Sequence, residues 1–195
     1  MALTSAQLKG RIKNIAARNN ADARLLMRIY MMDRFLECLS KSKYRENFVI
    51  KGGILVTSLL GVSMRSTMDI DAGISNLNLS AEDAERVVEE IMSIKLDDGV
   101  SFNLKKTSDI MDEAEYPGVR LELDALMGEM TTPIKIDIST GDVITLEAVE
   151  YSYDLLVEGR SIKILAYNLE TVLGEKLQTI PNTKTDRGSY LLMRL

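Results

Sequence analysis

The sequence predicts an α+β fold in which a mixed β-sheet carries helices mostly on one side. Apolar residues recur at helical spacing over residues 4–40. Apolar and polar residues alternate over residues 119–125 and 134–138, as is typical of half-buried strands. The chain has 195 residues, of which 46% are hydrophobic, and this is enough for one substantial core. We therefore expect a single domain over residues 1–195.

Residues 4–40 are expected to form two helices separated by Asn19-Asn20. Their apolar sides carry Leu8, Ile12 and Ile15 in the first helix and Leu25, Ile29, Met32, Leu36 and Leu39 in the second. Cys38 lies within the second apolar pattern and is expected to be a packed, unreactive thiol. A single cysteine allows no internal disulfide, which fits a reducing cytoplasm.

The core of the domain is expected over residues 46–165. It begins with a β-branched run that ends at Lys51, followed by an apolar helix from Gly52 to Gly61 and a strand over residues 68–71. Further strands are expected over residues 100–106, 119–125, 134–138, 151–157 and 161–165.

The remaining segments are assigned by capping and turn residues. Ser80 is expected to cap a helix that precedes the strand at residue 100. Residues 73–79 and 107–115 are expected to be loops. A last helix, capped by Asn168, is expected over residues 169–180.

Composition excludes several kinds of site. Histidine is absent, so acid–base or metal chemistry must use carboxylates, Lys or Tyr. The net charge of −5 argues against a strongly basic nucleic-acid-binding surface overall, although it leaves room for a local basic patch. No run of eighteen apolar residues occurs, and residues 1–13 lack the apolar segment of a signal peptide. We expect a cytoplasmic protein without a membrane span.

The stretch from Val49 to Asp71 carries the strongest functional pattern. If its last part is a strand, Asp69 and Asp71 point to one face, about 7 Å apart. Carboxylate oxygens suit a hard cation such as Mg²⁺, and Gly52-Gly53 at a helix start lets backbone amides approach a phosphate. The alternative is a pair of solvated carboxylates beside a turn.

A third carboxylate is expected to complete the site. Metal-assisted phosphoryl or nucleotidyl transfer uses two carboxylates to hold the metal and a third to activate the attacking hydroxyl. Asp137 is our candidate, because it lies in a strongly apolar strand where an unpaired charge is costly. Glu122 and Asp124 are the competing residues, and an exposed acidic face is the alternative.

Four residues near the glycines and aspartates are candidates for contact with phosphate. They are Lys51, Arg65, Ser66 and Thr67. The two hydroxyl groups can instead cap the turn, and the two cations can be ordinary surface charges.

The spacing of these motifs resembles a known superfamily. Gly-Gly followed by a gap of sixteen positions, from residue 53 to 69, and then Asp-hydrophobic-Asp resembles the DNA polymerase β-like nucleotidyltransferases. The strings KGG and RSTMDID, together with residues 116–142, resemble the AbiEii/AbiGii-type nucleotidyltransferase toxins of toxin–antitoxin and phage-defence systems. This resemblance runs from about residue 20 to about residue 180 and implies a polymerase β-like palm.

The resemblance also implies a chemistry. It implies transfer of a nucleoside monophosphate (NMP) from a nucleoside triphosphate (NTP), with Mg²⁺ or Mn²⁺ held by Asp69, Asp71 and Asp137. Lys176 in LGEKL matches a lysine that contacts the triphosphate in the family. An RNA acceptor such as a tRNA 3′ end, and a cognate antitoxin, are implied partners. Basic residues available for RNA are Lys41, Lys43, Arg45, Lys105 and Lys106.

Two alternatives to this function stay open. A small molecule such as an aminoglycoside, or a protein hydroxyl, can replace RNA as the acceptor. The other alternative arises because residues 186–190, DRGSY, depart from the family pattern and the chain ends at Leu195. We therefore expect the family's C-terminal helical domain to be truncated, and the alternative is a catalytically impaired nucleotide-binding or protein-interaction module of the same fold.

Overall fold

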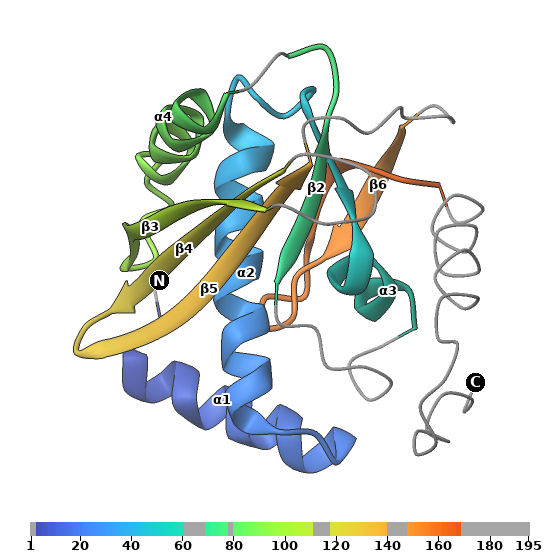
Figure 1. The fold of residues 1–195 in the computed structure, drawn as a ribbon. Helices are drawn as coiled ribbons and strands as arrows, with labels where there is room; N and C mark the ends of the chain where they lie inside the picture. The colour runs from blue at the N-terminus through green and yellow to red at the C-terminus, as the bar shows by residue number, and fades with distance from the viewer. Residues whose placement is uncertain (1–2, 61–68, 78–79, 111–117, 140–147, 169–195) are drawn as a thin grey trace, which may run out of the picture.

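The computed structural model describes residues 3–60, 69–77, 80–110, 118–139 and 148–168 (Figure 1). These residues form four helices and one seven-stranded mixed sheet, which confirms the predicted α+β class. No helix in this part of the chain is long and apolar enough to cross a membrane.

The sheet has the strand order β3-β4-β5-β2-β1-β7-β6. The β2–β5 and β1–β7 pairs are parallel and the other neighbours are antiparallel. The predicted meander of two strands beside the aspartate strand is therefore present as β4 and β5 next to β2. The strands are β1 (Phe48–Lys51), β2 (Ile70–Ile74), β3 (Val100–Ile110), β4 (Gly118–Met127), β5 (Met130–Ser139), β6 (Val149–Asp154) and β7 (Ser161–Ala166).

The two predicted N-terminal helices are α1 (Ser5–Asn19) and α2 (Ala23–Lys41). Asn20 ends α1 in the left-handed region, with φ of 50°, a conformation that Asn tolerates better than most residues. The predicted cap of α4 (Ala81–Met92) is also present, because the Asp83 backbone N–H donates a hydrogen bond of 3.1 Å to the Ser80 hydroxyl.

Most of the core lies between one face of the sheet and the helices α1, α2 and α4. In the view of Figure 1, α2 runs behind the sheet and α3 (Gly52–Leu60) lies in front of it. Successive residues of a strand point to opposite faces, so Phe48 and Ile50 join the main core while Val49 packs with Leu55 of α3. Helices mostly on one side of the sheet were predicted, and this is confirmed.

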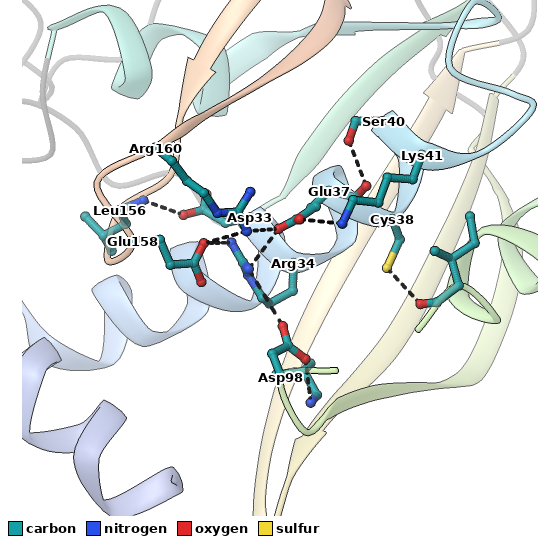
Figure 2. Close-up of polar contacts among 12 residues, drawn as sticks. Asp33, Arg34, Glu37, Cys38, Ser40, Lys41, Asp98, Leu156, Glu158 and Arg160 are labelled. Carbon is teal, nitrogen blue, oxygen red and sulfur yellow. Dashed lines mark hydrogen bonds and ion pairs between the residues drawn. The ribbon is translucent and has the colours of Figure 1, made fainter. Parts of the chain in front are cut away.

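Helix α2 carries a network of buried charges that fastens it to the turn between β6 and β7 (Figure 2). Arg34 and Glu37 are 1% and 2% exposed and form an ion pair of 2.9 Å. Arg34 also pairs with Glu158 at 2.6 Å, and Arg160 pairs with Glu37 at 2.6 Å. The turn is thus held to the helix by ion pairs in which the α2 members, Arg34 and Glu37, are removed from water.

Asp33 joins α2 to the same hairpin by a separate set of contacts. Its fully buried carboxylate accepts hydrogen bonds from the Tyr153 hydroxyl at 2.7 Å and from the Leu156 backbone N–H at 2.8 Å. Burial raises the pKa of Asp33 to about 7.

Several element boundaries differ from the sequence prediction. The predicted loop at residues 73–79 is wrong at its start, because β2 continues to Ile74 and Gly73 pairs with both Val49 and Ser139. The predicted loop at 107–115 is wrong over residues 107–110, which pair with β4 as an edge strand and need not be apolar. Strand β6 ends at Asp154 rather than residue 157.

Two further predictions concern Cys38 and the last helix. Cys38 is buried as predicted, and burial raises the pKa of its thiol to about 12. The predicted helix at 169–180 lies outside the described residues.

Candidate active site

Four charged side chains form a row across four adjacent strands. Lys51 of β1 lies opposite Asp71 of β2, Asp71 lies opposite Asp137 of β5, and Asp137 lies opposite Arg120 of β4. Residues directly opposite one another in neighbouring strands project to the same face of a sheet. We call these four residues the charge row. Two carboxylates therefore stand side by side, with one cation on either side of them.

Gly52 and Gly53 place the start of α3 against Asp71. Gly52 has φ of 70°, and a Cβ atom there would overlap the Asp71 carboxylate. The Gly53 backbone N–H donates a hydrogen bond to that carboxylate. The two glycines thus allow the first residues of α3 to lie directly against the Asp71 carboxylate. Contact of the same glycines with a phosphate stays a prediction.

The environment of Asp71 disfavours its negative charge. Burial and the neighbouring carboxylates of Asp137 and Asp69 raise the pKa of Asp71 to about 6, against the effect of the Gly53 hydrogen bond and the Lys51 ammonium group. A bound divalent cation would offset the repulsion among these carboxylates. Carboxylate oxygens are also the donor type that Mg²⁺ prefers.

Asp137 is held by Arg120, a residue that the sequence interpretation did not single out. The Arg120 guanidinium donates to both oxygens of Asp137, from Nε to Oδ1 at 2.8 Å and from Nη2 to Oδ2 at 2.6 Å. This two-point contact raises the pKa of Arg120 above its ordinary value. The Asp137 side chain is 18% exposed and that of Arg120 is 38% exposed, so the pair is open to an incoming ligand.

A turn signal in the sequence contains the information needed to find this pair. Gly128 and Glu129 join β4 to β5, and Gly128 has φ of 59°, as in a type II′ hairpin turn. Counting back along both strands from this two-residue turn brings Arg120 opposite Asp137.

The other carboxylate candidates lie in different places. Asp69 directly precedes β2, which begins at Ile70, and is therefore beside Asp71 but outside the strand predicted to hold it. Glu122 lies opposite Lys135, and Asp124 forms an ion pair of 3.5 Å with Lys105. Of the three candidates for the third carboxylate, Asp137 is the one that lies opposite Asp71.

Of the remaining predicted site residues, the structure describes Lys51. The Lys51 ammonium lies 5.6 Å from the centre of the Tyr167 ring, so the aromatic face helps to hold it. Arg65, Ser66, Thr67 and Lys176 lie outside the described residues. Within the described ranges, no three acidic or sulfur side chains group closely enough to hold a metal ion.

Comparison with known proteins decides the family. A family model described as the nucleotidyl transferase AbiEii toxin of type IV toxin–antitoxin systems matches residues 34–194, which is most of the chain. The chain belongs to the AbiEii family.

Two crystal structures from Helicobacter pylori resemble this AbiEii-family protein. One is JHP933, with a TM-score of 0.49 and 16% identity over 85% of this chain and 61% of that one. The other is described as a candidate nucleotidyltransferase, with a TM-score of 0.44 and 17% identity over 75% of this chain and 55% of that one. The AbiEii-family chain thus spans less than two thirds of the length of either of these two solved structures. None of the curated proteins matches its sequence significantly.

The charge row of this AbiEii-family protein suits a polyphosphate and a divalent cation. Asp71 and Asp137 of the row, and Asp69 directly before β2, supply oxygen donors of the correct type, and Lys51 and Arg120 supply positive charge on either side. In this structure Asp137 directs both oxygens at Arg120. Each of these oxygens keeps a further lone pair, so Asp137 can take part in binding a metal while it stays paired with Arg120.

Proposed function

We propose that this AbiEii-family protein is a Mg²⁺-dependent nucleotidyltransferase that moves an NMP from an NTP to an acceptor hydroxyl on RNA, such as a tRNA end. It would be the toxin of a toxin–antitoxin pair, act in the cytoplasm and bind a cognate antitoxin. The observation that carries the proposal is the charge row, in which Asp137 lies opposite Asp71 and Asp71 lies against the glycines that begin α3.

The reaction requires one bond to form and one to break. The acceptor hydroxyl oxygen attacks the α-phosphorus of the NTP, the bond from that phosphorus to the β-phosphate oxygen breaks, and pyrophosphate leaves. The hydroxyl proton passes to a carboxylate, for which Asp137 is our candidate. Lys51 and Arg120 flank the carboxylates and would bind phosphate oxygens. Mg²⁺ or Mn²⁺, held by Asp69 and Asp71 with Asp137, would supply further charge neutralisation.

A labelling experiment tests this proposal. The protein is incubated with Mg²⁺, total tRNA and each of the four α-labelled NTPs in turn, beside the paired variant Asp69→Ala/Asp71→Ala. Asp109→Asn is the matched control, because Asp109 is an exposed carboxylate on the edge strand β3. We expect label on RNA with the parent and the control but not with the paired variant. Equal labelling by all three proteins would overturn the assignment of these aspartates.

The Arg120 contact favours a second candidate function. Because both oxygens of Asp137 accept hydrogen bonds from Arg120, the chain can be a module that binds NTP without transferring it. In that case NTP would bind in the presence of Mg²⁺, but no label would move to RNA, protein or a small-molecule acceptor such as an aminoglycoside. Absence of both binding and transfer would exclude the two candidates together.

A further inference from the structure

A second charged feature lies away from the charge row, where α1 and α2 meet the start of β5. A hollow of about 360 Å³ opens there between the two helices and the residues Thr131 to Pro133. Four cationic side chains line it, Lys9 and Lys13 from α1 and Arg24 and Arg28 from α2. We call this hollow the basic groove.

The groove belongs to a segment whose charge is opposite to that of the rest of the chain. Residues 5–28 contain six Lys or Arg and one Asp, which gives this segment a net charge of +5. The whole chain has a net charge of −5, so the residues outside the segment together carry −10. The one acid, Asp22, caps α2 by accepting a 2.6 Å hydrogen bond from the Arg24 backbone N–H. A negatively charged ligand would be drawn to this segment and repelled by the remainder.

Three of the four groove cations are also available for a ligand. Lys9, Lys13 and Arg24 are exposed, and no carboxylate among the described residues pairs with their side chains. In contrast, four of the basic residues that the sequence suggested for RNA contact are already in ion pairs. These are Lys41 with Glu37 at 2.8 Å, Lys43 with Glu90 at 2.7 Å, Arg45 with Glu150 at 2.6 Å and Lys105 with Asp124 at 3.5 Å.

Strand β5 connects the basic groove to the charge row. Pro133 lines the groove, and Lys135 and Asp137 follow it on the same face of the strand. Asp137 lies four positions after Pro133, a span of roughly 13 Å in extended chain. The helices of the groove cover the opposite face of the sheet from the charge row, so a polymer with one negative charge per unit would reach both places by passing around the start of β5.

We propose that the basic groove binds the phosphate backbone of the RNA acceptor while its end lies at the charge row. The identity of the ligand rests on the proposed transfer to RNA. The groove would hold the acceptor mainly through charge, because four of its lining side chains are cations.

Binding of a labelled single-stranded RNA to the full chain, measured over a range of salt concentrations without NTP, tests this proposal. The groove variant is Lys9→Gln/Lys13→Gln/Arg24→Gln. The control variant, Arg86→Gln/Lys95→Gln/Lys163→Gln, removes three positive charges from exposed positions outside the groove. Thermal unfolding of both variants checks that each remains folded.

We expect the groove variant to lose at least about tenfold in affinity at low salt, with the slope of log affinity against log salt smaller by about two. The control should stay within about twofold of the parent. Equal losses in the two variants, or no loss in either, would overturn the proposal. Poly-glutamate and anionic vesicles are probed in parallel, and equally strong groove-dependent binding of either would overturn the assignment to RNA.

Transfer assays separate this inference from the proposed function. A short oligonucleotide that cannot span from the charge row to the groove should be labelled equally by the parent and the groove variant. If nothing is labelled but RNA still binds at the groove, the proposed transfer fails and the binding site stands. If RNA is labelled and the groove variant binds it as tightly as the parent, the groove inference fails alone.

Discussion

Gly52 is the residue on which the geometry of the charge row depends most closely. Its positive φ and its contact with Asp71 both exclude a side chain. Gly52→Ala should cost about 1–2 kcal/mol for the backbone conformation and about 1–3 kcal/mol more for overlap with the carboxylate. Gly99→Ala is the matched control, because Gly99 has φ of 79° but open space where its Cβ atom would lie. Urea unfolding should show the larger loss for Gly52→Ala, and equal losses would contradict the close approach.

Asp71 predicts a pH dependence of stability in the metal-free protein. Its pKa in the folded state is raised from 3.8 to about 6, so the ionised carboxylate opposes folding. Below about pH 4 the group is largely protonated in both the folded and unfolded states. The loss of folding stability grows as the pH rises from about 4 to about 6, and it is complete above that. Asp71→Asn should therefore be more stable than the parent above pH 6, by up to about 3 kcal/mol, and should lose this advantage near pH 4.

Chemical unfolding at several pH values measures that difference, with Asp109→Asn as the control for loss of one exposed carboxylate. Addition of Mg²⁺ should stabilise the parent and not the Asp71→Asn variant. A stability difference that does not change with pH would show that the Asp71 carboxylate is not under electrostatic stress.

The sequence predicted the strand face on which Arg120 lies, but not its pairing with Asp137. Alternation along the chain placed Arg120 and Asp137 on polar faces of their strands, and Asp71 on the same kind of face. Single-strand patterns carry no information on which strand lies beside which. The pair became visible only with the register set by the turn at Gly128.

At the scale of elements, α2 anchors the β6–β7 hairpin through buried charge. Arg34→Met would leave Glu37 and Glu158 without their buried partner and should cost about 3–5 kcal/mol. Arg160→Met removes a side chain that is 48% exposed and should cost about 1 kcal/mol or less. Chemical unfolding of both variants measures the contrast. A similar, small loss in each would mean that the network is not shielded from water.

Most helices and strands were predictable from the sequence, whereas the pairing of distant strands in the sheet was not. Helical spacing predicted α1 and α2, and alternation predicted β4 and β5. The parallel pairing of β1 with β7 joins residues more than a hundred positions apart and has no local signal. Polar residues at the end of β3 also gave no sign of a strand, because an edge strand pairs through its backbone on one side only.

At the scale of the whole molecule, the sheet order assembles the charge row from four distant parts of the chain. Residues 51, 71, 120 and 137 become neighbours only because β1, β2, β5 and β4 lie side by side. These strands occupy the middle of the sheet, where backbone pairing on both sides fixes their positions. A rigid centre is a suitable place for groups that must meet a phosphate within a fraction of an ångström.

Net charge gave an incomplete view of the molecule. The value of −5 argues against a basic surface overall, but it conceals a segment of +5 at residues 5–28. The fold places part of that segment at the start of β5, in line with Asp137 along the strand. Separation of charge on this scale favours one orientation of a charged partner.

The mass of an RNA acceptor after incubation with unlabelled NTPs and Mg²⁺ tests the central claim most directly. With the parent protein we expect the RNA mass to increase by whole NMP units, and with Asp71→Asn we expect it to stay unchanged. An unchanged RNA mass with the parent, although NTP binds, would contradict nucleotidyl transfer to RNA. A gain of phosphate alone would contradict it as well, because attack would then have occurred at the γ-phosphorus.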